Sequence, residues 1–245
     1  MSYEIRAMSF VEILDTALRL VTNHFVLLVG LMAIVHVPGG LVVAYMTADL
    51  AQVLDEISAD QAAAVMTTGT AAFLVTMTVF SVLYPIMLTA TMYAIDQLYH
   101  DREVGLGEAL GQGMSNFKEV LGTWFVVTSL VSLGFICFVV PGIYLSLALV
   151  VVWPVMQIEK RFGMQAVRRS RELMNGNLLR AMGIFLVAGL AAGVLGGAVA
   201  WIPFVGLVGS LITQSATAAF AAATQMVLYF DIRCRKEGFD LERQA

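Results

Sequence analysis

Charged residues divide the chain into four long uncharged segments. Positions 20–48, 61–95, 120–158 and 181–230 contain no Asp, Glu, Lys or Arg. One membrane-spanning helix needs about 20 apolar residues, so the first two segments hold one span each and the last two hold two each. The segments do not alternate apolar and polar residues, which favours helices over the strands of a barrel.

Proline and glycine supply the turns that the two longer segments need. Pro141-Gly142 lies inside the third segment, and Pro203 lies in a Trp201–Gly206 turn inside the fourth. Proline cannot continue a helical hydrogen-bond ladder, and glycine accepts turn conformations. The predicted fold class is therefore all-α, a polytopic membrane protein with six transmembrane helices in one integral membrane domain, 1–245. The predicted spans are 25–46, 70–95, 119–139, 142–159, 181–202 and 205–230.

Three short amphipathic segments precede the first, third and fifth spans. Phe10, Ile13 and Leu14 recur at helical spacing in the first segment, opposite Glu12 and Asp15. We predict interfacial cytoplasmic helices at 8–22, 105–117 and 163–176. The order of interfacial helix, span, turn and span then occurs three times, as in a threefold hairpin repeat. Chance similarity between amphipathic helices is the alternative.

The basic residues predict the orientation. All 14 Lys and Arg residues fall in the N-terminal segment, the second and fourth loops and the C-terminal tail. Cytoplasmic loops carry an excess of Lys and Arg, so both termini are predicted to be cytoplasmic. The first loop instead has only acidic charges, at Asp49, Asp55, Glu56 and Asp60.

Composition indicates the class of protein, but the sequence contains no metal-binding or catalytic motif. The chain is 59% hydrophobic and 13% charged, whereas a soluble domain is about a quarter charged, so a water-soluble enzyme domain is excluded. Its three histidines and two cysteines have no metal-ligand spacing, and its glycines form no phosphate-binding loop. We predict no metal, no cofactor, no nucleic-acid partner and no catalytic residues. Cys137 and Cys234 are not expected to form a disulfide.

Three segments carry a family resemblance. Phe10–Leu20 reads F-x-E-I-L-D-x-A-x-R-L, Ala166–Gly176 contains R-S-x-E-L, and Tyr229–Glu242 reads Y-x-D-x-R-x-R-x-E-G-x-D-L-E. Together they resemble the membrane domain of the glycerophosphoryl diester phosphodiesterase family and similar uncharacterised bacterial multi-span proteins. The resemblance implies a stand-alone membrane domain in the bacterial inner (plasma) membrane, without the soluble hydrolase barrel.

His36 is the ionisable residue deepest in a predicted span, two positions before Pro38. Pro38 is a predicted hinge or turn, because a proline loosens the helix and frees a carbonyl. An ionisable group inside a membrane is a functional candidate, so His36, Thr76 and Ser81 form a candidate intramembrane polar site. The alternative is a neutral imidazole bound to the freed carbonyl or to a neighbouring Ser or Thr. Because the spans contain no acidic partner for a proton relay, we favour the neutral imidazole.

Two further features have a structural and a functional interpretation. Gly189, Gly193 and Gly197 are spaced four apart, which favours close helix packing over a substrate-facing groove. The loop at 160–180 carries six basic residues beside an apolar segment. These residues either contact anionic lipid headgroups or only set the topology. The predicted headgroup contacts are Lys160, Arg161, Arg168, Arg169 and Arg171.

The leading functional hypothesis is a non-enzymatic inner-membrane protein that acts as a scaffold or regulatory partner. Its expected partners are membrane lipids, together with another membrane protein or further copies of the chain. The alternative is a transporter or permease-like subunit for a small or lipidic substrate. A path to the midplane lined by Thr76, Ser81 or His36 would favour the alternative.

Overall fold

The computed structural model describes residues 5–54, 59–200 and 206–238, and this part of the chain contains ten helices and no strand. Six helical segments within it are long and apolar enough to cross a membrane. The predicted all-α, multi-pass fold class is confirmed. The six segments are Phe25–Tyr45, Thr76–Tyr99, Phe117–Cys137, Val139–Glu159, Leu178–Val199 and Gly206–Glu237.

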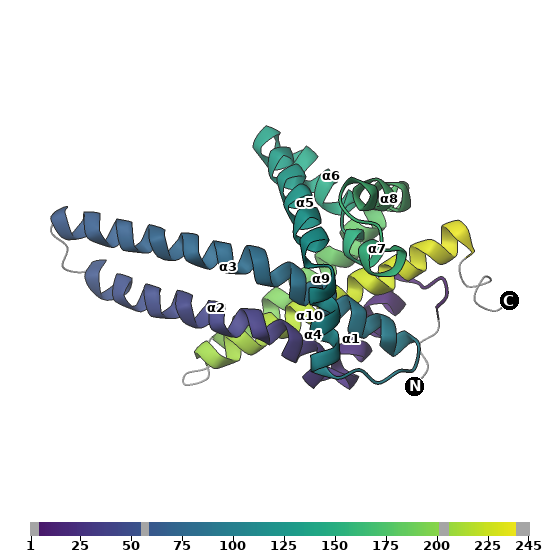
Figure 1. Cartoon of the computed structure of the whole chain (residues 1–245), viewed down its shortest axis with the longest axis horizontal. Coiled ribbons are helices and arrows are strands. Elements are labelled where there is room, and N and C mark those ends of the chain that lie inside the picture. The colour runs from purple at the N-terminus through teal and green to yellow at the C-terminus, as the bar shows by residue number, and fades with distance from the viewer. Residues whose placement is uncertain (1–4, 55–58, 201–205, 239–245) are drawn as a thin grey trace.

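The helices form three hairpins, and a short amphipathic helix precedes each of them (Figure 1). The first unit is α1 (Phe10–Asn23), α2 (Phe25–Leu54) and α3 (Ala59–Tyr99). The second is α4 (Leu106–Ser115), α5 (Phe117–Cys137) and α6 (Val139–Ala148), followed by α7 (Val152–Glu159). The third is α8 (Met164–Met174), α9 (Leu178–Ala200) and α10 (Gly206–Glu237). The order of elements therefore occurs three times.

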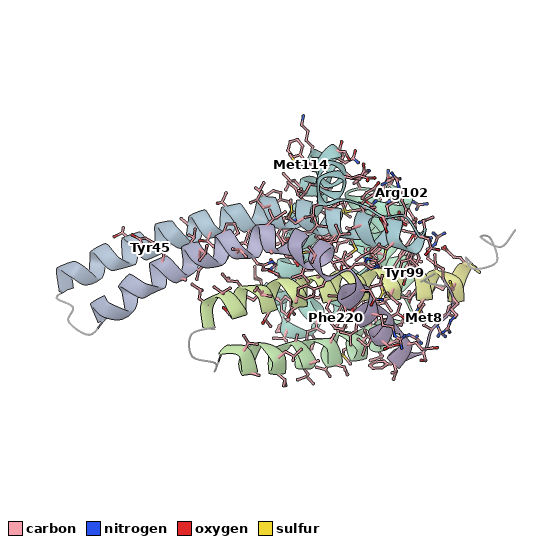
Figure 2. The ribbon with its side chains drawn as sticks, turned by 90° about the horizontal axis from the view of Figure 1, so that it is seen from below. Met8, Tyr45, Tyr99, Arg102, Met114 and Phe220 are labelled. Atoms are coloured by element: carbon pink, nitrogen blue, oxygen red, sulfur yellow. The ribbon has the colours of Figure 1, made fainter. Side chains whose placement is uncertain are left out.

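The hairpins do not share one direction. α2–α3 and α9–α10 extend the same way from the body, and α10 packs along α2 (Figures 1 and 2). The α5–α6 hairpin leaves the body in a clearly different direction (Figure 1). The repeated order of helices is thus not accompanied by a symmetric arrangement of the three hairpins.

The core lies where the three hairpins meet. Ile13, Met92, Met156, Met174 and Tyr229 come from five different helices and are fully buried there. The outer parts of the hairpins instead expose large apolar side chains, such as those of α5–α6 and α9. Such a surface is unfavourable in water and is normal where lipid covers it. These exposed residues include Ile136, Phe138, Val140, Leu190, Val194 and Leu195.

The turn between α5 and α6 lies at Phe138, and not at Pro141-Gly142 as predicted. Phe138 has an extended backbone, and Pro141 falls in the first turn of α6. A proline is tolerated there because the first backbone N–H groups of a helix have no intrahelical partner. Gly142 instead allows close contact between the helices, because a Cβ on it would lie 2.4 Å from the Phe135 ring.

The other predicted turn residues have different positions. Pro38 lies inside α2 and does not end that helix. Pro203 lies outside the described residues.

The predicted fourth span, 142–159, is broken in the structure. α6 ends at Ala148 and α7 begins at Val152. Pro154 accounts for the break, because its ring would clash with the carbonyl of Val150 in a continuous helix. The hydroxyl of Ser170, on α8, donates a 2.8 Å hydrogen bond to the carbonyl of Ala148. Protein thus satisfies the last carbonyl of α6, as an interruption at membrane depth requires.

Candidate functional site

The start of α1 is bound to the end of α10 through a fully buried carboxylate. Oδ1 of Asp231 accepts hydrogen bonds from the Met8 backbone N–H at 2.7 Å and from Nε of Arg235 at 2.9 Å. Arg180, on α9, forms an ion pair with Oδ2 at 3.1 Å, without hydrogen-bond alignment. Both arginines also donate to the carbonyl of Met8. We call Met8, Arg180, Asp231 and Arg235 the Asp231 cluster; Figure 2 shows Met8 beside the end of α10.

Local sequence fixes the first turn of α1 beside this cluster. Ser9 caps the helix, and the carboxylate of Glu12 accepts the Ser9 backbone N–H in return, which forms a capping box. The Ser9 N–H and the Arg6 guanidinium lower the pKa of Glu12 from 4.5 to about 2. The helix therefore begins directly after the residue that Asp231 holds.

A second cluster joins α7, α8 and α10. Nε of Arg169 lies 2.9 Å from both carboxylate oxygens of Glu159, and the Tyr229 hydroxyl donates to the same carboxylate at 3.1 Å. Arg169 and Arg233 both form ion pairs with Glu237. Burial would lower the pKa of Arg169, but its bonds to Glu159 and Glu237 raise it, so this guanidinium remains charged. We call these five residues the Glu159 cluster.

Both clusters have the chemistry of structural joints. Their carboxylates accept from two or more donors, and the donors belong to different helices. Such carboxylates join helices through charge-assisted hydrogen bonds and ion pairs, which is a structural role. Within the described residues, no group of three or more His, Cys, Asp and Glu side chains could hold a metal ion.

The outer face of α8 carries cations that the clusters do not use. Ala166, Val167 and Leu173 bury the inner face of this helix. Arg168 and Arg171 are exposed on its outer face, and neither has an ion-pair partner in the described parts of the chain. Lys160 and Arg161 are also exposed nearby, but Arg161 pairs with Glu159 at 3.3 Å.

Arg169 differs from the other predicted headgroup contacts. Its side chain is 16% exposed and bound to two carboxylates. The structure therefore leaves Lys160, Arg168 and Arg171 as the cations available to an external anion, and Arg161 as one shared with Glu159.

No protein-family model, curated protein or solved structure matches this chain. The proposed function therefore depends on the geometry of the described residues.

The structure places His36 in an aromatic cluster between α2 and α3. Nδ1 of His36 lies 2.9 Å from the carbonyl of Met32, and its ring makes edge contacts with Phe80 and Tyr84, both at 6.0 Å. This carbonyl is not the one that Pro38 frees, because that one belongs to Ile34. The imidazole is thus held by the helix on which it lies.

The hydroxyls of α3 do not combine with His36 into one polar site. Thr78, Thr89 and Thr91 each donate to the carbonyl four residues earlier. Thr76 is buried, and Ser81 is half-buried. The bonded threonines satisfy their own helix rather than lining a path.

The glycine stripe of α9 does not pack closely against the described parts of the chain. A Cβ added to Gly189, Gly193 or Gly197 would meet no described atom within 4 Å. Close helix contacts occur instead at Gly113 and Gly142, where an added Cβ would lie 2.8 Å from the Ile86 carbonyl oxygen and 2.4 Å from Phe135. The predicted packing role of the stripe is therefore not found within one chain.

Sequence reasoning missed the two clusters themselves. The signal was present, because Asp231 and Arg180 bound the same uncharged segment and Glu159 ends another. Charges at the ends of apolar helices meet when those ends converge. The alternating charges of the tail supply Asp231, Arg233, Arg235 and Glu237 to these clusters.

Proposed function

We propose that the protein is a non-enzymatic inner-membrane protein that acts as a scaffold or regulatory partner and contacts anionic lipid headgroups through α8. One observation carries the proposal: α8 is anchored on one face and exposes Arg168 and Arg171 on the other, without ion-pair partners in the described part of the chain. Cations near a membrane surface are attracted to anionic headgroups.

The proposed orientation places α8 and both termini on the cytoplasmic side. It is supported by the basic residues, which favour that side of a bacterial membrane. Membership of the glycerophosphoryl diester phosphodiesterase membrane-domain family belongs to the same proposal. Its support is that the described residues of the three resembling segments lie in or directly after α1, α8 and the end of α10, and that α10 contacts the other two helices.

The headgroup contact is tested with the whole protein in detergent. Arg168→Gln/Arg171→Gln should weaken binding of added phosphatidylglycerol by roughly tenfold or more, measured by native mass spectrometry, since each cation near a membrane surface contributes about 1 kcal/mol. Added salt should reduce the difference. Arg169 is left intact because its loss would break the Glu159 cluster.

Arg102→Gln/Lys118→Gln is the matched control. It removes the same charge from exposed positions outside α8. The proposal requires a much smaller loss of phosphatidylglycerol from the control than from the α8 variant. Equal losses would mean that overall charge, and not α8, determines binding.

No observation in the described residues favours the transporter alternative. The broken α6–α7 segment resembles the interrupted helices of transporters in backbone only, because the interruption is buried and Ser170 satisfies it. The alternative remains the hypothesis to test if the α8 contact fails.

A further inference from the structure

An apolar groove runs between α1, α9 and α10. Its volume is about 460 Å³, within the range of about 300–1,000 Å³ that is usual for small-ligand sites. Leu18 lines it from α1, Phe25 from the start of α2, Ala191 from α9, and Phe220 from α10. Figure 2 shows Phe220 close to the crossing of α1 and α10. The groove is thus bounded by one amphipathic helix and two helices able to cross a membrane.

The threonine hydroxyls in the wall donate their hydrogen bonds to backbone carbonyls of their own helices. Thr22 donates to the carbonyl of Leu18 at 2.9 Å. Thr213 and Thr217 donate to carbonyls four residues earlier in α10, both at 2.8 Å. The lining of the groove is therefore mainly apolar. A hydrocarbon chain suits such a wall, whereas a sugar or nucleotide would lose hydrogen bonds to water without replacing them.

α1 and the first residue of α2 leave apolar side chains uncovered along this groove. Val11 is 71% exposed and Leu18 53%, although other residues of α1 are completely buried, and Phe25 at the start of α2 is 45% exposed. A hydrocarbon chain in the groove would cover them, which is favourable because apolar surface is removed from water.

One carboxylate lies in this apolar wall. Asp15 lines the groove, and its Oδ2 accepts a 2.8 Å hydrogen bond from Nε of Arg19. Both side chains are at least half exposed, so they can reach a ligand at the groove edge. The remaining guanidinium N–H groups suit a phosphate, and the carboxylate suits an ammonium group. A headgroup that carries a phosphate but no amine would meet Asp15 with a like charge.

We infer that this groove binds one molecule of an amine-bearing zwitterionic phospholipid of the phosphatidylethanolamine class. An acyl chain lies along Leu18, Ala191 and Phe220, the phosphate binds Arg19, and the ammonium group binds Asp15. The inference needs the membrane location of α9 and α10 but not the headgroup contact of α8. If experiments disprove the lipid site in the groove, the headgroup contact of α8 is unaffected, and the reverse also holds.

Filling the groove tests the acyl-chain contact. The whole protein in detergent is titrated with dioleoyl-phosphatidylethanolamine, and bound lipid is counted by native mass spectrometry. Ala191→Trp should reduce binding by at least about tenfold, a loss of about 1.4 kcal/mol. Leu190→Trp is the matched control, because Leu190 is 62% exposed on the same helix and does not line the groove. It should bind as the wild type does.

The headgroup contact is tested by comparison with dioleoyl-phosphatidylglycerol. The comparison uses Arg168→Gln/Arg171→Gln as its background, so that α8 does not contribute phosphatidylglycerol binding. This protein should prefer phosphatidylethanolamine by about fivefold or more, and adding Asp15→Asn should remove the preference without emptying the groove. Glu108→Gln is the control, because it removes another exposed, arginine-paired carboxylate that does not line the groove. Equal affinity of the background protein for the two lipids would overturn the headgroup assignment.

A measurement without variants covers the case in which Ala191→Trp fails to fold. Phosphatidylethanolamine with a diazirine on its acyl chain should cross-link the wild type mainly in α1 and at 187–195 and 213–220. Cross-links spread evenly over all lipid-exposed helices, including α5, would overturn the inference. A dimer that Ala191→Trp dissociates with lipid binding unchanged would also overturn it, because a second copy would then occupy the groove.

Discussion

α1 and α8 have the same place in the repeated order of helices but present different outward faces. Each is short and amphipathic, precedes a hairpin and contacts α10. α1 is held by the backbone of Met8 and exposes Val11 and Leu18, whereas α8 is held by Arg169 and Ser170 and exposes arginines. A shared amphipathic pattern therefore determines that a helix docks. It does not determine what the helix offers to the membrane.

The largest expected effect is a loss of stability that distinguishes the attachment of α1 from that of α8. Asp231→Ala should lower the free energy of unfolding by about 3 kcal/mol, because it leaves the buried Met8 N–H and the part-buried guanidinium of Arg180 without their acceptor. Thermal or denaturant unfolding in detergent measures the loss. Hydrogen exchange should show that α1 loses protection while α8 retains it.

The control for this variant is Asp15→Ala, which breaks an exposed ion pair and should cost at most about 1 kcal/mol. If α8 lost as much protection as α1, the two helices would share one attachment and the comparison would be wrong.

The third amphipathic helix, α4, docks by close backbone approach. An added Cβ at Gly113 would lie 2.8 Å from the carbonyl oxygen of Ile86. Gly113→Leu should therefore destabilise the protein by about 1–3 kcal/mol in thermal unfolding. Gly193→Leu introduces the same side chain where no described atom lies within 4 Å. It should change stability by no more than about 0.5 kcal/mol, and a similar loss from both would contradict the placement of α9.

Removing the hydroxyl that joins α8 to the broken span should have a smaller effect. Ser170→Ala leaves the buried carbonyl of Ala148 without this donor, which should lower the free energy of unfolding by about 1–3 kcal/mol. We expect a value near the lower limit because a single neutral hydrogen bond is lost. Denaturant unfolding measures it, with the exposed Ser115→Ala as the control. Ser170→Thr should keep the bond and rank between Ser170→Ala and the wild type. An unfolding midpoint for Ser170→Ala equal to that of the wild type would mean that the bond does not stabilise the break.

The smallest expected effect is a pH dependence at the start of α1. The folded pKa of Glu12, about 2, is below its ordinary value of 4.5. Its contribution to stability is therefore complete above about pH 4.5 and is lost as the pH falls through 2. Local hydrogen exchange at Ser9 and Glu12 should show this loss in the wild type but not in Glu12→Gln. α8 has no capping carboxylate in its first turn and should show no matching change.

The fold was largely predictable because its determinants are local. Uncharged segments identify spans, and helical spacing of Phe10, Ile13 and Leu14 identifies an amphipathic helix. The prolines were harder to interpret, since Pro141 and Pro154 are each the third residue of a helix that follows an interruption. The interruption before Pro141 lies between the two helices of a hairpin, whereas the one before Pro154 lies within one candidate span. Both prolines lack the same N–H group, so packing and not the proline decides the difference.

The site was less predictable because it depends on contacts between distant segments. Arg168 and Arg169 are adjacent in sequence, yet about 100° of helical rotation separates their side chains, so one faces outward and the other reaches Glu159. Nothing in the local sequence distinguishes them. The groove was missed for the same reason, since three helices from opposite ends of the chain form it.

The bond between Met8 and Asp231 joins residues 223 positions apart, which has a consequence for biogenesis. The first helix of the protein leaves the ribosome long before its carboxylate partner is synthesised. Until then, the apolar face that later docks on α10 must be covered by lipid or by an insertion factor. A chain that stops before Asp231 cannot complete this attachment. The docked position of α1 therefore depends on synthesis of the segment that contains Asp231.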